Sequence, residues 1–465
     1  MIDPKLLLIT GATGYVGGRL LAELEANGHY RLRCLARDPQ ALRGRVASGT
    51  GVVFGDVISG VGLDAALDDV DTAVYLIHSM HAPDFEAVDR RAAANFASAA
   101  RAAGVRRVIY LGGLGADGDA LSPHLRSRRE VGDILRSSGC EVIELRASIV
   151  IGAGSLSFEM IRALVERLPL MITPRWVSVP SQPIGIRDLL RMLVAAIEMP
   201  GTGSRVLEAG GADVVSYSGI MREYARQRGL RRVMVPVPVL TTRASSLWLR
   251  LITPLEAQAG RALIDSIRHP TVVAGRDARE ALGIRTAPLR DAVAQALADT
   301  RSAGTGVGLL VDSRAVWVDV PPAAAFAAVC RVGGRDGWFL GGGWLWRMRG
   351  AVDRLIADDD QHARRQHEAL KVGDAVDYWR VEAIDPGRRL RLVAAARLPG
   401  RVALDFAVRG AEGGTEIRQT AEFDAAGIVG LAGWYGAKPV HRLIFGGMLR
   451  RVARSARREG TTSGG

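Results

Sequence analysis

The chain has 465 residues, more than one hydrophobic core usually organises, so we expect two or three domains. It is 48% hydrophobic and 24% charged, which is the composition of an ordinary soluble protein. Its formal net charge of +12 comes almost entirely from arginine. Because no long basic run with interleaved aromatic residues appears, we attribute the charge to a solvated surface and expect no nucleic-acid partner.

The three cysteines, Cys34, Cys140 and Cys330, are far apart and odd in number. This excludes a disulfide framework and the usual zinc-binding spacings, so we predict no metal site and a cytoplasmic location. A strand pattern begins within a few residues of the first residue, which leaves no visible signal peptide. The chain has no run of about 18 uncharged apolar residues, so we predict no membrane span.

The first predicted element, KLLLIT (5–10), is a short apolar strand that runs directly into GATGYVGG. The residues after this turn have helical periodicity, which stops at Gly28. Three spaced glycines between a strand and a helix predict a dinucleotide-binding turn. Gly11 permits the tight turn, Gly14 lets the backbone approach a pyrophosphate, and Gly17 lets the helix pack closely on the strand. We expect the phosphates at the helix N-terminus, where free N–H groups and the helix dipole favour an anion.

The second strand, Arg31–Ala36, is followed by Arg37 and Asp38. A site selective for NAD usually has a carboxylate here to hold the ribose 2′-hydroxyl. In this chain Arg37 comes first and Arg33 precedes it, and a guanidinium pairs well with a 2′-phosphate. We therefore predict NADP as the cofactor, with NAD as the alternative. The third strand, VVFGDV, carries Asp56 near its end, which we expect to accept a hydrogen bond from the adenine amino group.

Strands and helices continue to alternate along the chain. TAVYLIHSM (72–80) predicts a fourth strand that is buried on both faces, because it is largely apolar. Residues 84–103 and 123–138 predict helices, and residues 106–115 and 141–152 predict the fifth and sixth strands. This order indicates an α/β fold with a doubly wound parallel Rossmann sheet, whose ligand lies above the carboxyl ends of the strands. His78, Ser79 and residues 112–115 are expected at that rim.

The first half of the chain contains several characteristic motifs, and the resemblance that they carry covers roughly the first 300 residues. The motifs are TGATGYVGG, GDV, VIYLGG, the charged helix that follows it, and LRASIVIGAGS. Together they resemble the atypical or extended short-chain dehydrogenase/reductases, above all the NmrA-like and complex I accessory-subunit-like group. The resemblance continues through SVPSQPIGIRDLLRMLVAAIE and RVLEAGG, which in such proteins form a later strand, a helix starting near Asp188, and a sheet return within a substrate lobe. It implies a cofactor site made of Gly11, Thr13, Gly14, Tyr15, Val16, Gly17, Arg37, Asp56, Val57, Ile77, His78 and Arg128.

Redox-active members of this family keep a Ser at the end of the fifth strand and a Tyr-x-x-x-Lys motif on the next helix. The Tyr hydroxyl exchanges a proton with the substrate carbonyl, and the Lys lowers the Tyr pKa and holds the nicotinamide ribose. Here the strand ends in Gly112-Gly113, and HLRSR (124–128) places His124 in the register of the Tyr and Arg128 in that of the Lys.

These substitutions change the chemistry that the site can perform. Arg128 can hold a ribose or a phosphate, but it is too basic for proton transfer. His124 is either a general acid near neutral pH or a residue that only caps or flanks the helix. Tyr110 lies inside the fifth strand and is expected to pack rather than react.

Residues 1–299 are expected to form the Rossmann domain, with a substrate lobe over residues 151–299 and a helix over residues 214–232. The segment 233–254, VMVPVPVLTTRASSLWLRLITP, is apolar and broken by proline. We predict that this segment packs on the Rossmann core. The alternatives are that it forms a wall of the substrate site, a surface for a partner, or a surface that contacts a membrane.

Residues 300–308, TRSAGTGVG, predict a linker because they are rich in Gly, Ser and Thr. A strand, a helix opened by Pro321-Pro322, four strands and a final helix then predict an α+β domain with an antiparallel sheet over residues 309–458. We expect a disordered tail over residues 459–465. The order of elements resembles the START/SRPBCC helix-grip domains, which implies an apolar ligand cavity between the sheet and the last helix.

Two patterns bear on that second domain. Val402, Leu404, Phe406 and Val408 alternate with polar or small residues, so one sheet face is buried. Two glycines in the middle of the final helix, residues 446–447, cost about 2 kcal/mol relative to alanine, which indicates close approach or cavity space. The final helix is also basic, with an apolar stripe of Val440, Ile444, Met448 and Val452, so an alternative is that it lies on an anionic membrane.

Three functions remain open. The first is an NADP-dependent oxidoreductase acting on a hydrophobic carbonyl or enoyl compound that the second domain helps to hold. The second is a non-catalytic NADP-binding sensor or assembly factor. The third is a lipid or isoprenoid carrier that makes peripheral contact with membranes.

Overall fold

The structure is a computed structural model of the chain. It describes residues 5–42, 44–80, 82, 84–115, 121–201, 203–237, 265–303, 310–331, 370–376, 379–395, 400–411, 414–425, 430, 433–434, 436 and 438–462. The chain forms two compact units, of which the first ends at Val307 and the second begins at Gly308.

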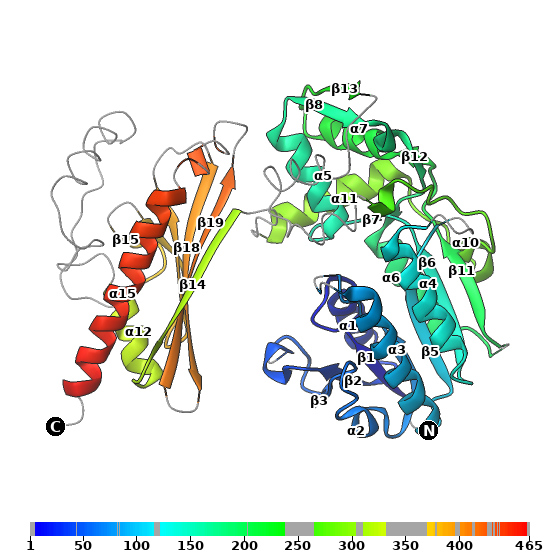
Figure 1. The fold of residues 1–465 in the computed structure, drawn as a ribbon, viewed down its shortest axis with the longest axis horizontal. Coiled ribbons are helices and arrows are strands. Elements are labelled where there is room, and N and C mark those ends of the chain that lie inside the picture. The colour runs from blue at the N-terminus through cyan, green and yellow to red at the C-terminus, as the bar shows by residue number, and fades with distance from the viewer. Residues whose placement is uncertain are drawn as a thin grey trace. The chain divides into compact units, whose positions relative to one another are not determined.

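The first unit contains a seven-stranded parallel sheet in the order β11-β6-β5-β4-β1-β2-β3 (Figure 1). Its strands are β1 (Leu6–Thr10), β2 (Arg31–Ala36), β3 (Gly51–Phe54), β4 (Val70–Tyr75), β5 (Arg107–Gly113), β6 (Glu141–Ala147) and β11 (Arg205–Ala209). Every neighbouring pair is parallel. The predicted doubly wound Rossmann sheet is therefore confirmed.

Helices cover both faces of this sheet because alternate residues of each strand point to opposite sides. Leu7 and Ile9 pack with α1 (Tyr15–Asn27) and α6 (Ile186–Glu198). Leu6 and Leu8 pack with the helices of the other face, α2 (Leu63–Leu67), α3 (Phe85–Ala102) and α4 (Pro123–Arg136). All residues of β1 are buried, as a strand covered on both faces requires.

Two segments differ from the sequence-based expectation. The single strand predicted over residues 141–152 is divided into β6 and the short β7 (Val150–Ile151), which pairs with β10 (Ile184–Gly185). RVLEAGG was expected within the substrate lobe, but β11 pairs in parallel with β6 and extends the main sheet. Its position satisfies backbone groups that would otherwise be exposed along the edge of β6.

The rest of the first unit consists of short elements. They are a 3₁₀ helix (Pro39–Leu42), α5 (Leu156–Arg167), β8 (Leu170–Pro174), a 3₁₀ helix (Arg175–Ser178), β9 (Pro180–Ser181), β12 (Val215–Ser216), α7 (Tyr217–Gln227), β13 (Val233–Val237), α10 (Ala278–Leu282) and α11 (Leu289–Ala303). The helix predicted over 214–232 is thus shorter, because Ser216 caps it by accepting from Gly219 N. The predicted linker begins within α11, whose helical hydrogen bonding continues to Ala303. Residues 238–254, the remainder of the predicted apolar segment, lie outside the described residues.

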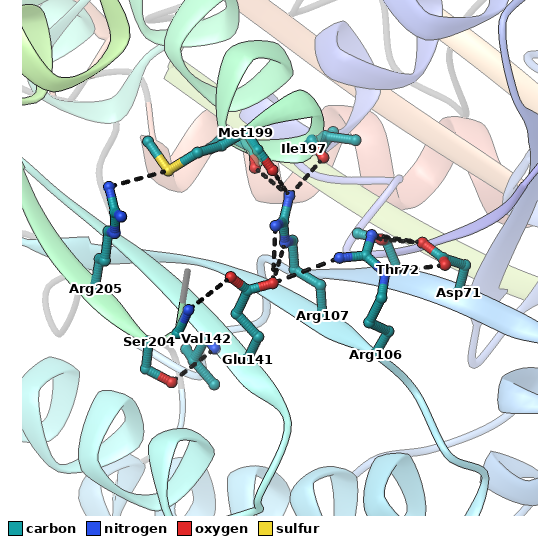
Figure 2. A network of polar contacts seen from close by, with 12 residues as sticks. Asp71, Thr72, Arg106, Arg107, Glu141, Val142, Ile197, Met199, Ser204 and Arg205 are labelled. Atoms are coloured by element: carbon teal, nitrogen blue, oxygen red, sulfur yellow. Dashed lines mark hydrogen bonds and ion pairs between the residues drawn. The ribbon is translucent and has the colours of Figure 1, made fainter. Parts of the chain in front are cut away.

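A charged network joins the amino ends of the strands (Figure 2). The buried Arg107 donates to Glu141 Oε2 at 2.8 Å and to the carbonyl of Ile197, at the end of α6, at 3.0 Å. Arg106 bridges Glu141 and Asp71, and its hydrogen bonds hold the pKa of Asp71 well below its usual range. Because this edge is opposite the ligand-binding rim, we assign the network to the docking of α6 against the sheet.

The second unit is built on a six-stranded antiparallel sheet in the order β14-β19-β18-β17-β16-β15. Its elements are β14 (Leu310–Val318), α12 (Pro322–Cys330), β15 (Ala375–Val376), β16 (Trp379–Asp385), β17 (Arg389–Ala394), β18 (Gly400–Ala411), β19 (Gly414–Ala425) and α15 (Lys438–Thr462). Both helices lie against one face of the sheet (Figure 1). Leu404, Phe406 and Val408 are buried in that core and Val402 packs at its margin, which confirms the predicted alternation.

Helix α15 packs its apolar stripe into this core. Met448 and Val452 are buried there together with Phe445 and Leu449. The part of the stripe formed by Met448 and Val452 is therefore covered by the core of this domain, and contact of α15 with a membrane stays a prediction. The helix also continues to Thr462, so residues 459–462 extend its hydrogen bonds instead of forming a disordered tail. Within the described residues, no helix is both long and apolar enough to cross a bilayer.

The side chain of Gln419 on β19 interrupts the apolar core beneath α15. A Cβ on Gly446 would lie 3.1 Å from Nη1 of Arg314 on β14, so this glycine allows close approach. Opposite Arg314, on β19, Gln419 is 1% exposed and neither of its amide atoms has a hydrogen-bond partner. A buried amide without a partner costs about 2 kcal/mol or more. A water or a polar group of a ligand at this position would stabilise the domain.

Candidate functional site

The turn between β1 and α1 has the conformation that three spaced glycines predict. Gly11 has φ of 71°, a region that glycine adopts readily. Gly14 is the N-cap of α1 and contributes no side-chain cap, so the first N–H groups of the helix remain open to an anion. A Cβ on Gly17 would lie 2.2 Å from the carbonyl oxygen of Gly11, so no larger residue fits without moving the turn. The conformational roles predicted for Gly11 and Gly17 are confirmed.

A cavity of about 310 Å³ lies beside this turn. Part of its lining is the turn itself, together with residues that follow the parallel strands, such as Leu76, His78 and Leu114. Another part comes from later in the chain. These later residues are Ser148, Ile149, Val150, Ser155, Leu156, Ser157, Val179, Ser181, Tyr217, Ser266, Ile267 and Thr271. The cavity therefore joins the nucleotide-binding turn to a mostly apolar wall with scattered hydroxyl groups.

Two tyrosines form part of the lining. The Tyr15 hydroxyl is buried without a hydrogen-bond partner, and burial raises the pKa of Tyr15 to about 12. Burial likewise raises the pKa of Tyr217. Ser157 is its polar neighbour, but the two do not form a hydrogen bond of ordinary geometry. Both phenols are therefore weak acids in this site.

Arg33 on β2 and Arg37 directly after that strand have different surroundings. Arg33 donates to carbonyl groups at the end of α2, including that of Ala66 at 2.9 Å. It caps that helix, so the expectation that Arg33 accompanies Arg37 at a 2′-phosphate is wrong. Arg37 is exposed at the carboxyl end of β2 and has no polar contact with another described residue. Asp38 accepts from Gln40 N at 3.0 Å and starts the next turn.

The residues after β3 form a self-contained turn. Asp56 accepts from Ile58 N at 3.1 Å and from the Ser59 hydroxyl at 3.0 Å. The carbonyl of the buried Val57 accepts from Asn95 Nδ2 at 3.0 Å. The carboxylate of Asp56 is thus already engaged within the turn, and its contact with adenine stays a prediction.

Arg128 lines the cavity as a buried, paired cation. Its guanidinium forms an ion pair with Asp89 of α3, and both side chains are buried. Nη1 also donates to the carbonyl of Ile77 at 3.4 Å, whereas Nε is buried without a hydrogen-bond partner. Ser127 donates to the same carboxylate oxygen of Asp89 at 3.1 Å. This arrangement keeps a positive charge at the cavity wall, which is what a ribose or phosphate contact requires.

His124 lies in the first turn of α4 and also lines the cavity. Its Nδ1 is 3.0 Å from the hydroxyl of Ser266. Burial, followed by the nearby charges of Arg128 and His78, lowers the pKa of His124 to about 3. This lowered pKa favours the neutral imidazole at neutral pH, which weighs against the general-acid role. Which of its two roles His124 has stays a prediction.

The end of β5 explains why the usual Ser is missing. A Cβ on Gly113 would lie 3.0 Å from Leu125, and one on Gly112 would lie 3.2 Å from the carboxylate of the buried Glu144. Those side chains fill the space that a serine would need. Tyr110 is fully buried and donates to the carbonyl of Arg128 at 2.8 Å, so its predicted packing role is confirmed.

Sequence patterns did not reveal the partners of these residues. Asp89 carries no motif, and Ser266 lies 142 residues from His124 along the chain. Tyr217 was assigned to a helix without a role in the site. Among the described residues, no group of three or more His, Cys, Asp or Glu side chains gathers as a metal site would. His81, His362 and His367 lie outside those residues.

Comparison with known families fits this geometry. Residues 11–150 match a family model described as NAD(P)H-binding. The first unit is an NAD(P)-binding Rossmann domain. The strand order and the retained glycine turn agree with the predicted resemblance to the atypical short-chain dehydrogenase/reductases, and the cofactor is of the NAD(P)H class. Residues 306–448 match a second model, "Protein of unknown function (DUF2867)", so the START/SRPBCC assignment of the second domain stays a prediction.

Similar proteins include sugar-nucleotide epimerases and reductases. UDP-glucose 4-epimerase of Vibrio cholerae is 24% identical over 271 residues, which are 51% of this chain and 80% of that protein. Ceramide reductase of Caulobacter vibrioides is 28% identical over 237 residues, which are 50% of this chain and 74% of that protein. Triphenylmethane reductase of Citrobacter sp., solved with NADP(H), has a TM-score of 0.53 at 19% identity and covers 62% of this chain and 99% of its own. The NADPH-dependent quinone oxidoreductase of Escherichia coli has a TM-score of 0.53 at 21% identity, with coverages of 63% and 99%. These structures share the fold of the Rossmann domain.

Replacing Arg37 by alanine is expected to weaken NADPH binding by about 10- to 100-fold and to leave NADH binding unchanged, because only NADPH carries the 2′-phosphate. Fluorescence titration of the full chain with each cofactor measures both affinities. Arg33→Ala is the matched control, and it should leave the ratio of the two affinities as it is. Equal weakening of both cofactors by Arg37→Ala would contradict the assignment.

Proposed function

We propose that the chain is an NADPH-dependent reductase of a hydrophobic compound that bears a carbonyl group. The observation that carries this proposal is the single cavity that joins the glycine turn to an apolar wall. Leu156, Val179 and Ile267 contribute to that wall, and none of them is needed to bind a nucleotide phosphate. Sites for small apolar ligands commonly combine such a wall with a few polar groups.

The residues present fit the cofactor at its charged end and at its ribose. The space left by Gly17 and the open N–H groups of α1 suit the pyrophosphate, Arg37 suits the 2′-phosphate, and Arg128 suits the nicotinamide ribose. Bound NADPH would supply a hydride to the carbon skeleton of the substrate. The apolar wall excludes water from the reacting groups and selects a hydrophobic compound. With three unpaired cysteines, we place this activity in the reducing cytoplasm.

We assign the second domain the role of binding the hydrophobic compound. Its interior face is apolar, and the amide of Gln419 within it is buried without a partner. A ligand with an apolar body and one polar group suits those surroundings. This role is part of the proposal and rests on the interior of that domain alone.

A non-catalytic sensor is the second candidate, and one observation favours it. The usual Ser and the usual proton-donating Tyr are both missing, since β5 ends in glycines and His124 stands in the register of the Tyr. In that function NADPH binding would alter the affinity of the chain for a partner, and the hydride would never leave the cofactor.

One experiment separates the two candidates. Native mass spectrometry of the purified full chain first identifies bound NADPH and any co-purified hydrophobic compound. NADPH oxidation is then followed with quinones, enones, aldehydes and long-chain ketones, and the product is quantified. We expect saturable turnover of at least one compound, with one NADPH consumed for each product formed. Tight NADPH binding with no turnover of any class would favour the sensor.

A further inference from the structure

A chain of three polar side chains connects the start of α4 to the cavity. The Ser122 hydroxyl caps α4 by accepting from Leu125 N at 3.2 Å. Its oxygen is 3.1 Å from that of Ser266, which in turn is 3.0 Å from Nδ1 of His124. Ser122 and Ser266 are buried, and His124 and Ser266 both line the cavity. Ser122, Ser266 and His124 are therefore joined in one continuous chain of polar contacts, which we call the relay.

One direction of the protons in this relay is compatible with its fixed end. A backbone N–H can only donate, so Ser122 accepts from Leu125 and keeps its own proton to give. In the pairs of Ser122 with Ser266 and of Ser266 with His124, either atom can be the donor, and we take the direction in which Ser122 donates to Ser266 and Ser266 donates to Nδ1 of His124. An imidazole that accepts at Nδ1 carries its own proton on Nε2. Because Nδ1 is occupied by Ser266, the Nε2–H side is what His124 can present to a ligand.

The surroundings keep this imidazole neutral. Arg128 lies one turn further along α4, and His78 follows β4 on the same side of the cavity lining. Asp89, the only carboxylate paired with Arg128 among the described residues, is already engaged by that arginine. Burial and these two neighbours lower the pKa of His124, so both the loss of solvent and the nearby charges disfavour protonation of its imidazole.

We infer that Ser122 and Ser266 hold His124 as the neutral Nε2–H tautomer, and that this N–H donates a hydrogen bond to the carbonyl oxygen of the substrate. The inference rests on the proposed reductase function and deepens it. His124 is then a catalytic residue that polarises the carbonyl, and Ser266 is a positioning residue. A preorganised donor of this kind contributes about 100-fold to the rate when negative charge develops on the oxygen.

This donor restricts the class of substrate. A neutral imidazole N–H is a far weaker acid than an imidazolium, so its main contribution is a hydrogen bond to the oxygen. Reduction of a simple ketone concentrates the developing charge in an alkoxide, which is nearly as basic as hydroxide, whose conjugate acid has a pKa of about 16. A delocalised product anion is much less basic; a phenolate, for example, has a conjugate acid with a pKa of about 10. The phenols of Tyr15 and Tyr217 also line the cavity; burial raises their pKa, so they too can donate hydrogen bonds but do not readily give up a proton. The site therefore suits conjugated carbonyl compounds.

The step balances for an enone. The hydride forms a C–H bond at the β-carbon, and NADPH becomes NADP⁺. The π pair of the C=C bond moves to form the enolate, whose oxygen accepts from His124 Nε2–H. Once the enolate leaves the cavity, solvent water supplies the proton that converts it into the saturated ketone, and the hydroxide that forms is neutralised in solution. His124 keeps its own proton throughout.

The tautomer is tested first, by a readout that does not need turnover. Long-range ¹⁵N–¹H NMR of the full chain with labelled histidine, assigned through His124→Gln, should show Nε2–H and no titration between pH 5 and 8. Ser266→Ala should weaken this preference, whereas Ser137→Ala, on the exposed end of α4, should leave it unchanged. An Nδ1–H tautomer, or an imidazolium at pH 6, would overturn the inference.

The donor role is tested by kinetics with 3-decen-2-one and the matched saturated ketone 2-decanone. We expect the enone to be reduced at least 100-fold faster, with a flat pH profile from 5 to 8. His124→Leu should lower kcat about 100-fold without changing NADPH affinity, and His124→Gln, which keeps an N–H donor, should recover part of the loss. Ser266→Ala should give a smaller loss.

The outcomes separate the inference from the function beneath it. Turnover that is unaffected by His124→Leu overturns the donor role and leaves the proposed reductase intact. Equal rates for the enone and the ketone, or a pH profile with a pKa near 6.5 that disappears in His78→Asn, overturn the neutral-donor mechanism. If no compound of any class is reduced, the proposed function fails and the donor role fails with it, while the NMR result still decides the tautomer.

Discussion

Replacing Gly17 by alanine is expected to weaken NADPH binding at least about 100-fold and to destabilise the Rossmann domain by about 1–3 kcal/mol. The added Cβ would lie 2.2 Å from the carbonyl oxygen of Gly11, far inside van der Waals contact, and that oxygen belongs to the backbone. Either α1 moves away from β1 or the turn opens. In both cases the N–H groups at the start of α1 no longer converge on the pyrophosphate.

The measurement is thermal unfolding of the full chain with and without NADPH, together with a binding titration. A ligand that binds only the folded chain raises Tm, so the wild type should gain stability and Gly17→Ala should gain almost none. Gly49→Ala is the control, since a Cβ there would meet no atom within 4 Å. A Gly17→Ala chain that keeps the Tm gain of the wild type would show that the cofactor does not rest on this turn.

Replacing Arg128 by methionine is expected to destabilise the first domain by about 3–5 kcal/mol, because it leaves the carboxylate of Asp89 buried and unpaired. The side chains of Asp89 and Arg128 are 2% and 7% exposed, so water cannot easily replace the lost partner. Asp89→Leu alone should be comparably costly, since it leaves a buried guanidinium. The double variant removes both charges and should recover most of the loss.

Urea unfolding of the four chains forms a double-mutant cycle, and the shift in midpoint at constant slope reports the change in free energy. A coupling energy well above 1 kcal/mol is expected for a pair this deeply buried. If the two single losses simply add in the double variant, the ion pair does not support the cavity wall.

Local sequence patterns predict the parts of this site that depend on neighbours in the chain. The glycine turn was predictable because strand, turn and helix are consecutive, glycine adopts φ of 71° readily, and only glycine permits the close approach at residue 17. The α/β alternation was equally predictable, since buried parallel strands are apolar throughout. Tyr110 was correctly expected to pack because it lies within such a strand.

Side-chain partners from distant segments were not predictable in the same way. Arg33 and Arg37 look alike in the sequence, yet the end of α2 happens to place carbonyl groups within reach of Arg33. Nothing in the sequence around His124 indicates its surroundings. Its lowered pKa depends on burial and on the neighbours Arg128 and His78. Likewise, RVLEAGG reads as any short strand, and only the free edge of β6 decides which sheet it joins.

The antiparallel sheet of the second domain also constrains how the chain acquires its structure. The strands from β16 to β19 are joined by short connections, so each can form soon after the one before it. In contrast, β14 comes first in the chain but pairs with β19, so that Ser313 and Thr420, 107 residues apart, face each other. Closing so long a loop is entropically unfavourable and slow. During synthesis, the backbone groups of β14 can therefore form their sheet hydrogen bonds only after β19 has been made.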